Sequence, residues 1–380
     1  PEWFATINGP GWQRRWLEAG ELQRQLDYWQ AQLGDEHPVL ELPIDYPRPV
    51  LPSYRGRRLE HVVDAALVEQ LRGVARQHGV TLFMLLLGTF NILLHRYTGQ
   101  DDLRVGVPIA NRNRREIEGL IGCFVNTQVL RVQLDGQTRL GDLLRDIKET
   151  ALGAQAHQDL PFERLVEALK LERSLSYNPL FQVMYNHQPE VADVTTLKVG
   201  SGLELGVIEW ETRSTQFDLS LDTYEKGGHL HAAFTYASDL FNPDTIERMA
   251  RHWTLLLRNI VNDPQQRVGE LALLAPADYR QVVTEWARHD TSWPSERPVH
   301  ELFEAQAERS PDAIALICDG QRLSYGQLNA RSNRLARTLV AAGVGPDVLV
   351  GIAVDRSVDL VVAILAVLKA SGAYVPLDPQ

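Results

Sequence analysis

The sequence predicts an α/β protein built from two successive blocks. Helix and strand patterns alternate through residues 12–264, the pattern then weakens, and a second alternation begins at Val299. The chain of 380 residues is long enough for two to three domains of about 150 residues each. Hydrophobic residues make up 44% and charged residues 23%, a globular composition that argues against a fibrous or disordered protein.

The first block has the pattern of strands covered by amphipathic helices. Apolar residues at helical spacing predict helices over 12–33, 64–78, 81–97, 139–156 and 243–261. Strand-like runs lie at 103–109, 124–134 and 180–187, and a hairpin joins 216–225 to 229–236 across Lys226-Gly227-Gly228. The connector LPIDYPRPVLPSYRG is predicted to be extended, because a residue that precedes proline is disfavoured in the α conformation.

The second block begins after a stretch without clear periodicity. Residues 265–298 are predicted to be a linker, which divides the chain into 1–264, 265–298 and 299–380. Beyond the linker we expect a helix, a hairpin of 314–317 with 322–324, a helix over 325–342, a strand at 348–354 and a helix over 358–370. The final AYVPLDP is strand-like, so this block corresponds to the opening of an α/β domain.

Charge, apolar runs and cysteines disfavour several classes of protein. The net charge of −11 disfavours nonspecific binding to nucleic acid or to an anionic membrane. The longest apolar run, 82–94, has 13 residues, whereas a membrane-spanning helix needs about 20. Cys123 and Cys318 lie far apart in strand-like segments, which predicts a reduced cytoplasmic protein rather than a disulfide scaffold or a zinc site.

The ends of the chain and a search for common motifs add two expectations. The chain starts at Pro1 without a secretory signal and stops at Gln380 directly after a strand-like run, so we expect an internal piece of a longer protein. It contains no GxxxxGK[ST], HExxH, GxSxG or CxxC motif, and residues 299–380 contain no GxGxxG.

Five motifs resemble one family. Residues 121–131 (IGCFVNTQVLR), 157–163 (HQDLPFE) and 173–181 (RSLSYNPLF) resemble, in order and spacing, the later signature motifs of condensation domains of nonribosomal peptide synthetases. Residues 323–328 (LSYGQL) and 368–379 (LKASGAYVPLDP) resemble the first two motifs of their adenylation domains. The resemblance spans essentially the whole chain, and five ordered motifs are far more specific than a single glycine-rich loop.

The resemblance implies a fold and a catalytic motif. It implies a chloramphenicol-acetyltransferase-like condensation lobe, a mixed sheet with helices, followed by the truncated N-terminal part of an α/β adenylate-forming domain. In the family two such lobes surround a tunnel, where an upstream acyl or peptidyl thioester meets a downstream aminoacyl amine. The family's catalytic HHxxxDG motif is absent from this chain, since neither His229 and His231 nor His187 is followed by the required Asp-Gly. We expect it upstream of residue 12, and no catalytic residue is assigned here.

Several polar residues are candidates for the substrate channel. Asn126, Thr127 and Gln128 would hydrogen-bond the substrate amide or a phosphopantetheine arm if they point inward; strand alternation alone would instead place them on the solvent face. His157 and Asp159 are further candidates, because a histidine beside a carboxylate can be tuned as a base. Hydrogen bonds that hold the end of a helix explain this second pair equally well.

The remaining candidates are one asparagine and a group of arginines. Asn178 is a channel candidate, although Asn178-Pro179 is also typical of a turn before a strand. Four arginines are candidates to bind the aspartate of the missing HHxxxDG motif. The alternative is that they are solvated surface charges beside Glu116 and Glu118. They are Arg112, Arg114, Arg115 and Arg131, of which Arg112 and Arg131 are the preferred structural candidates.

The motifs depart from the family pattern in places and imply cofactors elsewhere. RSLSYNPL replaces the usual RDxSRNPL, a variant common in domains that join two L-configured residues, although dual epimerising domains look similar here. Ser371 replaces a usual glycine, a change that should be tolerated.

We expect the ATP-site motifs beyond Gln380, so this piece should bind no cofactor. The parent would use ATP with Mg²⁺, and 4′-phosphopantetheine on carrier domains.

The function favoured by these observations is part of a peptide-forming enzyme. The parent would form amide bonds between carrier-tethered substrates and activate an amino acid as its adenylate, whereas this piece alone should be inactive. Its partners would be the upstream and downstream peptidyl carrier domains, the missing condensation lobe and the rest of the adenylation domain, with no nucleic acid, membrane or metal. The alternatives are a non-catalytic carrier-docking scaffold and a free-standing coenzyme A-dependent acyltransferase; LSYGQL and LKASGAYVPLDP disfavour the latter.

Residues 299–380 should be the less stable part of the chain, because their strands lack neighbouring strands to pair with.

Overall fold

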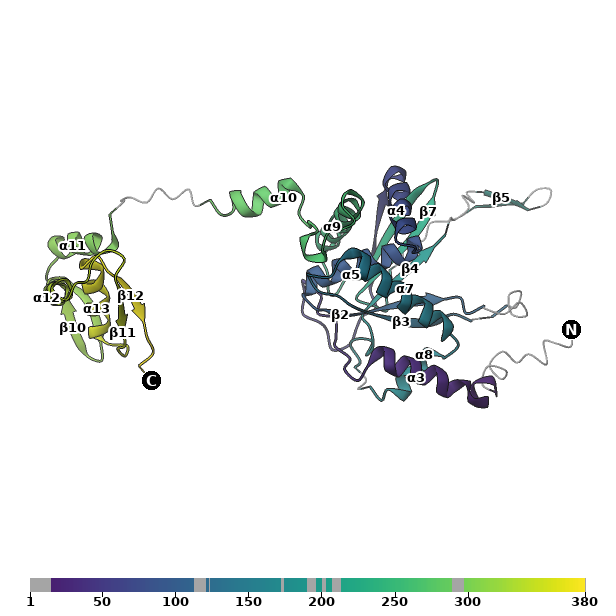
Figure 1. The fold of residues 1–380 in the computed structure, drawn as a ribbon, viewed down its shortest axis with the longest axis horizontal. Coiled ribbons are helices and arrows are strands. Elements are labelled where there is room, and N and C mark those ends of the chain that lie inside the picture. Colours follow the sequence, from purple (N-terminus) through teal and green to yellow (C-terminus); the bar gives the residue numbers. More distant parts are fainter. Residues whose placement is uncertain are drawn as a thin grey trace. The chain divides into compact units, whose positions relative to one another are not determined.

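The chain divides into two compact units, residues 1–287 and 288–380, which are described separately (Figure 1). The structure is a computed structural model that describes residues 15–112, 121–122, 124–171, 174–189, 196–199, 203–206, 213–288 and 297–379. Arg114, Arg115, Cys123 and Arg173 therefore lie outside the described residues. Of residues 196–199 and 203–206 only the backbone is described, as the short hairpin β5 (Thr196–Val199) and β6 (Leu203–Gly206).

A six-stranded mixed sheet forms the centre of the first unit, in the order β1-β8-β7-β4-β2-β3. The strands are β1 (Gly56–Val63), β2 (Asp102–Ile109), β3 (Asn126–Gln133), β4 (Val183–Gln188), β7 (Leu219–Lys226) and β8 (His229–Ala237). The central strands β2, β4 and β7 run parallel. Strands β3 and β8 pair antiparallel with β2 and β7, and β1 pairs antiparallel with β8 at the edge. The predicted hairpin turns at Gly227 and Gly228, whose φ angles of 58° and 79° favour glycine.

Four helices cover one face of this sheet (Figure 1). They are α4 (Ala65–Gln77), α5 (Leu82–Thr98), α7 (Leu140–Ala156) and α9 (Pro243–Asn262). Helix α5 is buried on nearly all sides, as its continuous apolar sequence predicts. Trp253 of α9 is fully buried and donates a hydrogen bond from Nε1 to Oγ1 of Thr89, 2.9 Å away. The predicted mixed sheet with helices is therefore confirmed.

The other face of the sheet is covered over part of its width. Helices α3 (Leu22–Leu33) and α8 (Phe162–Ala168) lie on the side of β3, and the Phe181 ring packs on Gly106 of β2. A Cβ at Gly106 would come within 2.3 Å of that ring, so only glycine fits there. Over β7 and β8 the same face carries Ser220, Asp222 and Thr235, which border a cavity.

The connector between α3 and β1 is tied to the sheet by polar contacts. Arg48 binds Asp218 through both carboxylate oxygens, with Nη1 2.8 Å from Oδ1. The amide of Asp45 donates to the carbonyl of Leu240 at 2.8 Å, and Asp45 accepts a hydrogen bond from the amide of Asn242 at the start of α9. The predicted extended connector thus lies along the ends of β7 and β8.

Several elements of the first unit differ from the sequence expectation, among them β1 and α8. Strand β1 was not predicted, because RRLEHVV mixes charges with apolar residues at this edge of the sheet. Helix α8 follows Pro161 in a segment too short for a clear helical period. The first predicted helix contains a π-helical turn, Leu17–Glu21, in which Gly20 has a φ of 115°.

Part of the predicted linker packs against the first unit. Val268 and Leu271 are 0% and 1% exposed, and Val268 begins the 3₁₀ turn Val268–Glu270. Nη1 of Arg96 donates to the carbonyls of Val268, Gly269 and Leu271 at 3.1, 3.4 and 2.7 Å. Helix α10 (Pro276–Arg280) and the π turn Gln281–Glu285 follow.

The second unit contains two small sheets and three helices in its described part, with the predicted element order confirmed. They are α11 (Val299–Arg309), the hairpin β9 (Ile314–Cys318) and β10 (Gln321–Ser324), α12 (Tyr325–Ala341), β11 (Leu349–Ile352), α13 (Val358–Lys369) and β12 (Ala373–Pro376). Strands β11 and β12 pair in parallel. Lys369 is buried, and its ammonium group binds Glu304 at 2.7 Å, Asn333 at 2.6 Å and Asn329.

In the part of the chain that is described, no single helix is long and apolar enough to cross a membrane. The bent pair α4 and α5 reaches the necessary length and composition only when both helices, which meet at 100°, are counted together.

Replacing Arg48 with Met should destabilise the first unit by about 3 kcal/mol, because Asp218 would keep its charge in a buried position without a partner. Urea unfolding followed by tryptophan fluorescence measures this, since Trp29 and Trp253 are buried in this unit. The double variant Arg48→Met/Asp218→Asn should recover part of the loss. Equal stability of Arg48→Met and the wild type would contradict this assignment.

Replacing Lys369 with Met should loosen the second unit, because Glu304 and two asparagine amides lose a common charged donor, at a cost of about 2 kcal/mol. Hydrogen exchange should become faster in 299–379 and stay unchanged in the strands of the first unit. Arg331→Met, at an exposed position of α12, is the matched control. Unchanged exchange in both variants would show that the contacts of Lys369 add no stability.

The stability of the first unit should fall as the pH drops from 7.5 to 5.5. Burial lowers the pKa of His37, His61, His187 and His252, so the unfolded chain binds protons first, near its ordinary histidine pKa of about 6.5. The four neutral histidines therefore contribute fully to the free energy of unfolding above that pH. This contribution is lost as the pH falls toward their lowered pKa values in the folded protein. Urea midpoints that stay constant over this range would contradict the expectation.

Candidate functional site

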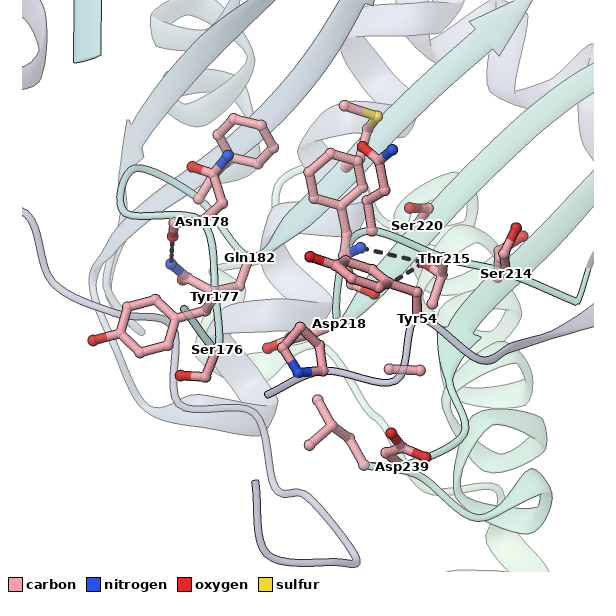
Figure 2. Close-up of a pocket in the computed structure, with 18 of the residues that line it drawn as sticks. Tyr54, Ser176, Tyr177, Asn178, Gln182, Ser214, Thr215, Asp218, Ser220 and Asp239 are labelled. Atoms are coloured by element: carbon pink, nitrogen blue, oxygen red, sulfur yellow. Dashed lines mark hydrogen bonds between the residues drawn. The ribbon is translucent and has the colours of Figure 1, made fainter. Parts of the chain in front are cut away.

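A cavity of about 1120 Å³ lies on the open face of the sheet in the first unit. Several parts of the chain border it, among them the connector around Arg48–Arg55, the loop Ser174–Pro179 and the segment Ser214–Asp218 (Figure 2). Its floor is formed by side chains of the sheet, among them Ser220, Asp222 and Thr235. Segments distant in the sequence thus meet around one space.

The loop wall is fixed to the connector by Gln182, whose side chain is almost fully buried. Its Nε2 donates to the carbonyl of Asn178 at 2.8 Å, and its Oε1 accepts a hydrogen bond from the amide of Leu40 at 2.7 Å. Oδ1 of Asn178 accepts a hydrogen bond from the amide of Leu180 at 3.0 Å, which closes the turn before β4. One side chain therefore links the loop to the connector.

The connector wall is fixed by backbone pairing and by ion pairs. The amide of Thr215 donates to the carbonyl of Tyr54 at 2.9 Å, so the end of the connector runs along the segment before β7. The guanidinium of Arg48 lies 5.7 Å from the centre of the Tyr177 ring, and Arg55 binds Asp239 at 3.1 Å. These contacts place Tyr54 and Tyr177 at the cavity (Figure 2).

Asp222 stands out among the charged groups of the floor. Burial raises the pKa of Asp222, while a hydrogen bond from the Asn186 amide at 3.3 Å opposes this rise. Arg58 pairs with Glu60 at 2.6 Å and also acts electrostatically on Asp222, which lowers the pKa of that carboxyl. Within the described residues, Asp222 has no cation within ion-pairing distance, unlike Asp218 and Asp239.

Of the predicted channel residues, Thr127 and Asn178 border the cavity. Asn126 instead holds the segment before α8: its Nδ2 donates to the carbonyls of Gln158 and Leu160 at 3.2 and 2.7 Å. Its Oδ1 accepts a hydrogen bond from the amide of Phe162 at 3.0 Å. Gln128 is buried and donates to the carbonyl of Ala154 at 2.6 Å, which ties β3 to α7. Neither Asn126 nor Gln128 is among the residues that border the cavity.

His157 faces helix α3 rather than the cavity. Its Nδ1 lies 2.8 Å from the carbonyl of Gly153, which can only accept, so this nitrogen carries the proton. Nε2 then accepts a hydrogen bond from Arg24 at 2.8 Å, and the ring stacks on Tyr28 with centroids 3.9 Å apart. Asp159 interacts electrostatically with the same Arg24 and does not border the cavity. The geometry of His157 corresponds to the alternative in which hydrogen bonds hold the end of a helix.

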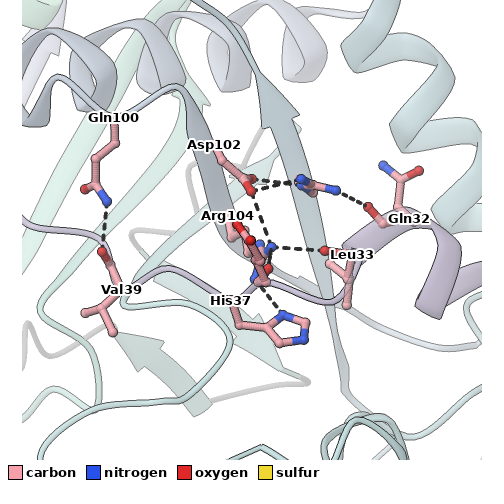
Figure 3. Close-up of polar contacts among 9 residues, drawn as sticks. Gln32, Leu33, His37, Val39, Gln100, Asp102 and Arg104 are labelled. Carbon is pink, nitrogen blue, oxygen red and sulfur yellow. Dashed lines mark hydrogen bonds and ion pairs between the residues drawn. The ribbon is translucent and has the colours of Figure 1, made fainter.

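Arg131 belongs to a polar cluster at the start of β2, whose members do not border the cavity (Figure 3). Its guanidinium binds both oxygens of Asp102 at 2.9 Å and donates to the carbonyl of Gln32. Arg104, which is 4% exposed, donates to the carbonyl of Leu33 at 3.0 Å and to Nδ1 of His37 at 2.7 Å (Figure 3). The cluster attaches the end of α3 to β2 and β3.

Arg112 lies with its guanidinium 4.4 Å from the centre of the Phe124 ring and donates to the carbonyl of Gly122 at 3.2 Å. It therefore contacts the segment that leads into β3.

Several residues of the site were not singled out from the sequence. Arg48, Asp218 and Gln182 owe their roles to partners more than 100 positions away, which no local pattern reveals. Ser220 and Asp222 carry a signal, because they alternate with the buried Leu219 and Leu221 in the predicted hairpin. That alternation identifies the uncovered face of β7.

Two family models match the chain. The model described as "Condensation domain" matches residues 11–283, and the one described as "AMP-binding enzyme" matches residues 303–380.

Curated relatives match along 97% of the chain. A component of the linear gramicidin synthase of Brevibacillus parabrevis is 44% identical over 372 residues, and chondramide synthase cmdD of Chondromyces crocatus is 43% identical over 371 residues. This chain spans only 7% and 9% of their respective lengths.

A solved structure has the same arrangement of elements and related sequence. Holo-AB3403, a four-domain nonribosomal peptide synthetase bound to AMP and glycine, aligns with a TM-score of 0.71 at 28% identity, over 94% of this chain and 28% of that one. Together with the family models, this likeness shows that the chain belongs to the condensation-domain family of nonribosomal peptide synthetases and continues into the start of an AMP-binding domain.

Proposed function

We propose that the cavity of the first unit forms one side of the channel in which carrier-tethered substrates are joined by an amide bond. The substrates would be an upstream acyl or peptidyl thioester and a downstream aminoacyl amine, each on the phosphopantetheine arm of a carrier domain. The observation that carries this proposal is a cavity built on the open sheet face of a condensation-family chain.

The chemistry of the walls suits a phosphopantetheine arm. Such an arm carries uncharged amides, which need hydroxyl and amide partners and little net charge. The described lining supplies these from Thr127, Ser176, Asn178 and Ser214, with the rings of Tyr54 and Tyr177 beside them. A volume of about 1120 Å³ slightly exceeds that of ordinary small-molecule pockets, at about 300–1,000 Å³, which fits an elongated group.

The roles we assign to this cavity are binding and positioning. No histidine is among the described residues that border it, so they offer no imidazole for proton transfer. We infer that the base belongs to a second lobe carrying HHxxxDG, which would close the channel from the other side. The wild-type chain alone should then bind substrates without joining them.

The second unit would contribute the opening of an amino-acid-activating domain that forms an adenylate from ATP with Mg²⁺. The described residues hold no cluster of three or more potential metal ligands, and we derive no step at this unit. Carrier domains, the second lobe and a cytoplasmic setting complete the proposal.

The channel proposal is tested with a pantetheine analogue whose end is an N-acetylated alanine joined through an amide instead of a thioester. Ligand-observed NMR should show binding to the wild-type chain and at least tenfold weaker binding to Ser220→Phe, because the larger ring occupies the floor of the cavity.

The matched control is Val62→Phe, which adds similar bulk at a half-exposed position of β1 outside the cavity. Binding that is equally strong in both variants would place the ligand elsewhere. Absence of binding to the wild type would overturn the channel proposal.

A further inference from the structure

The backbone of Tyr54 has a left-handed conformation at the edge of the cavity. Its φ angle is 57°, in a region that glycine favours and that a bulky residue rarely occupies. Of the non-glycine residues with positive φ in the described part of the chain, Tyr54 is the one that borders the cavity. Strain of this kind persists only where the surrounding structure imposes it, and it is concentrated at functional sites.

Hydrogen bonds on both sides of Tyr54 impose this conformation. The carbonyl of Tyr54 accepts a hydrogen bond from the amide of Thr215 at 2.9 Å, and the amide of Gly56 donates to the carbonyl of Arg213 at 2.9 Å. A Cβ at Gly56 would lie only 2.9 Å from the carbonyl carbon of Ser214, so the two backbones are in direct contact there. Rotating Tyr54 out of the left-handed region would break this pairing.

The ring of Tyr54 contributes little to the core of the unit. The residue is 56% exposed, and glycine would adopt the same backbone angle without strain. Figure 2 shows the ring extending from the connector into the space between the connector and the loop Ser174–Pro179. A large apolar face is therefore held at a fixed place beside the cavity, at a cost in stability.

We propose that Tyr54 is a binding residue for the pantetheine arm, and that its strained backbone fixes the ring against the two methyl groups that the arm carries on one carbon atom. These methyl groups are the largest apolar group of pantetheine. Because the exposed ring lies at the rim and not on the floor formed by Ser220 and Thr235, it meets the arm rather than the reacting end. The inference rests on the proposed channel and adds a residue that selects for the arm.

The fixed backbone makes this contact favourable. Binding has to order only the two side-chain torsion angles of Tyr54, so the apolar contact is gained at a small cost in conformational entropy. An arm without the two methyl groups would lose the contact, which corresponds to about fivefold in affinity when the methyl groups are partly buried. The ring would therefore recognise the arm whichever acyl group is attached to it.

The test compares two probes on the full chain by ligand-observed NMR. One probe is the N-acetylalanyl pantetheine analogue, and the other is the same molecule without the two methyl groups. The wild type should bind the first probe about fivefold more tightly. Tyr54→Ala should bind both probes equally, whereas Tyr54→Phe, which keeps the ring, should retain the preference.

Urea unfolding separates a binding role of Tyr54 from a structural one. The folding equilibrium constant of Tyr54→Gly should be about threefold larger than that of Tyr54→Ala, because only glycine relieves the left-handed strain. Tyr54→Gly should nevertheless lose the preference between the probes. The matched control is Lys170→Gly, because Lys170 has a φ of 50°, is exposed and does not border the cavity. This control should keep the preference.

The possible results are distinguishable. A preference that survives in Tyr54→Gly or Tyr54→Ala, that disappears in Lys170→Gly, or that is absent from the wild type overturns the role of Tyr54, while the channel proposal stands. A smaller folding constant for Tyr54→Gly than for Tyr54→Ala overturns the strain. The two small variants replace each other if circular dichroism shows one of them to be unfolded. If neither probe binds to the wild type, both proposals fall together.

Discussion

The bidentate ion pair between Arg48 and Asp218 is the contact on which the architecture of the site depends. It fastens a proline-rich connector, which has no strand or helix of its own, to the start of β7. The carboxylate of Asp218 is 8% exposed, so its charge needs this partner. With the connector held there, Tyr54 faces the loop that carries Tyr177, and the uncovered part of the sheet becomes the floor of a cavity rather than an open surface.

The same sheet provides the core of the first unit and the floor of the cavity, because successive residues of a strand point to opposite faces. In β7, Leu219 and Leu221 are fully buried beneath the helices, whereas Ser220 and Asp222 lie at the cavity. Toward β2 and β3, the second face is covered by α3, α8 and the Phe181 ring. Helices cover one face of this mixed sheet, whereas the second face is covered only over β2 and β3. The cavity lies on the uncovered part of that second face.

The motif residues of the sequence divide between the cavity and its supports. Within Asn126-Thr127-Gln128, Thr127 borders the cavity, while the side chains on either side bind backbone carbonyls of the segment 154–162. His157 and Arg131 likewise attach α3 to the rest of the unit. A motif recognised by its spacing thus contains residues that border the cavity and residues that hold the surrounding segments in place. The direction of each side chain decides which of these two roles the residue has.

The sequence by itself determined most of the elements, their order and the family, because helical period, strand alternation, turn glycines and ordered motifs are local patterns. The alternation of Ser220 and Asp222 with buried leucines is also a local pattern, although neither residue was singled out as a candidate. The tertiary structure decided that β1 adds to the sheet edge, that Val268 and Leu271 pack on the first unit, and that Arg48 meets Asp218 across 170 positions. These depend on which segments approach one another, and burial and ion pairing between distant segments leave no period in the sequence.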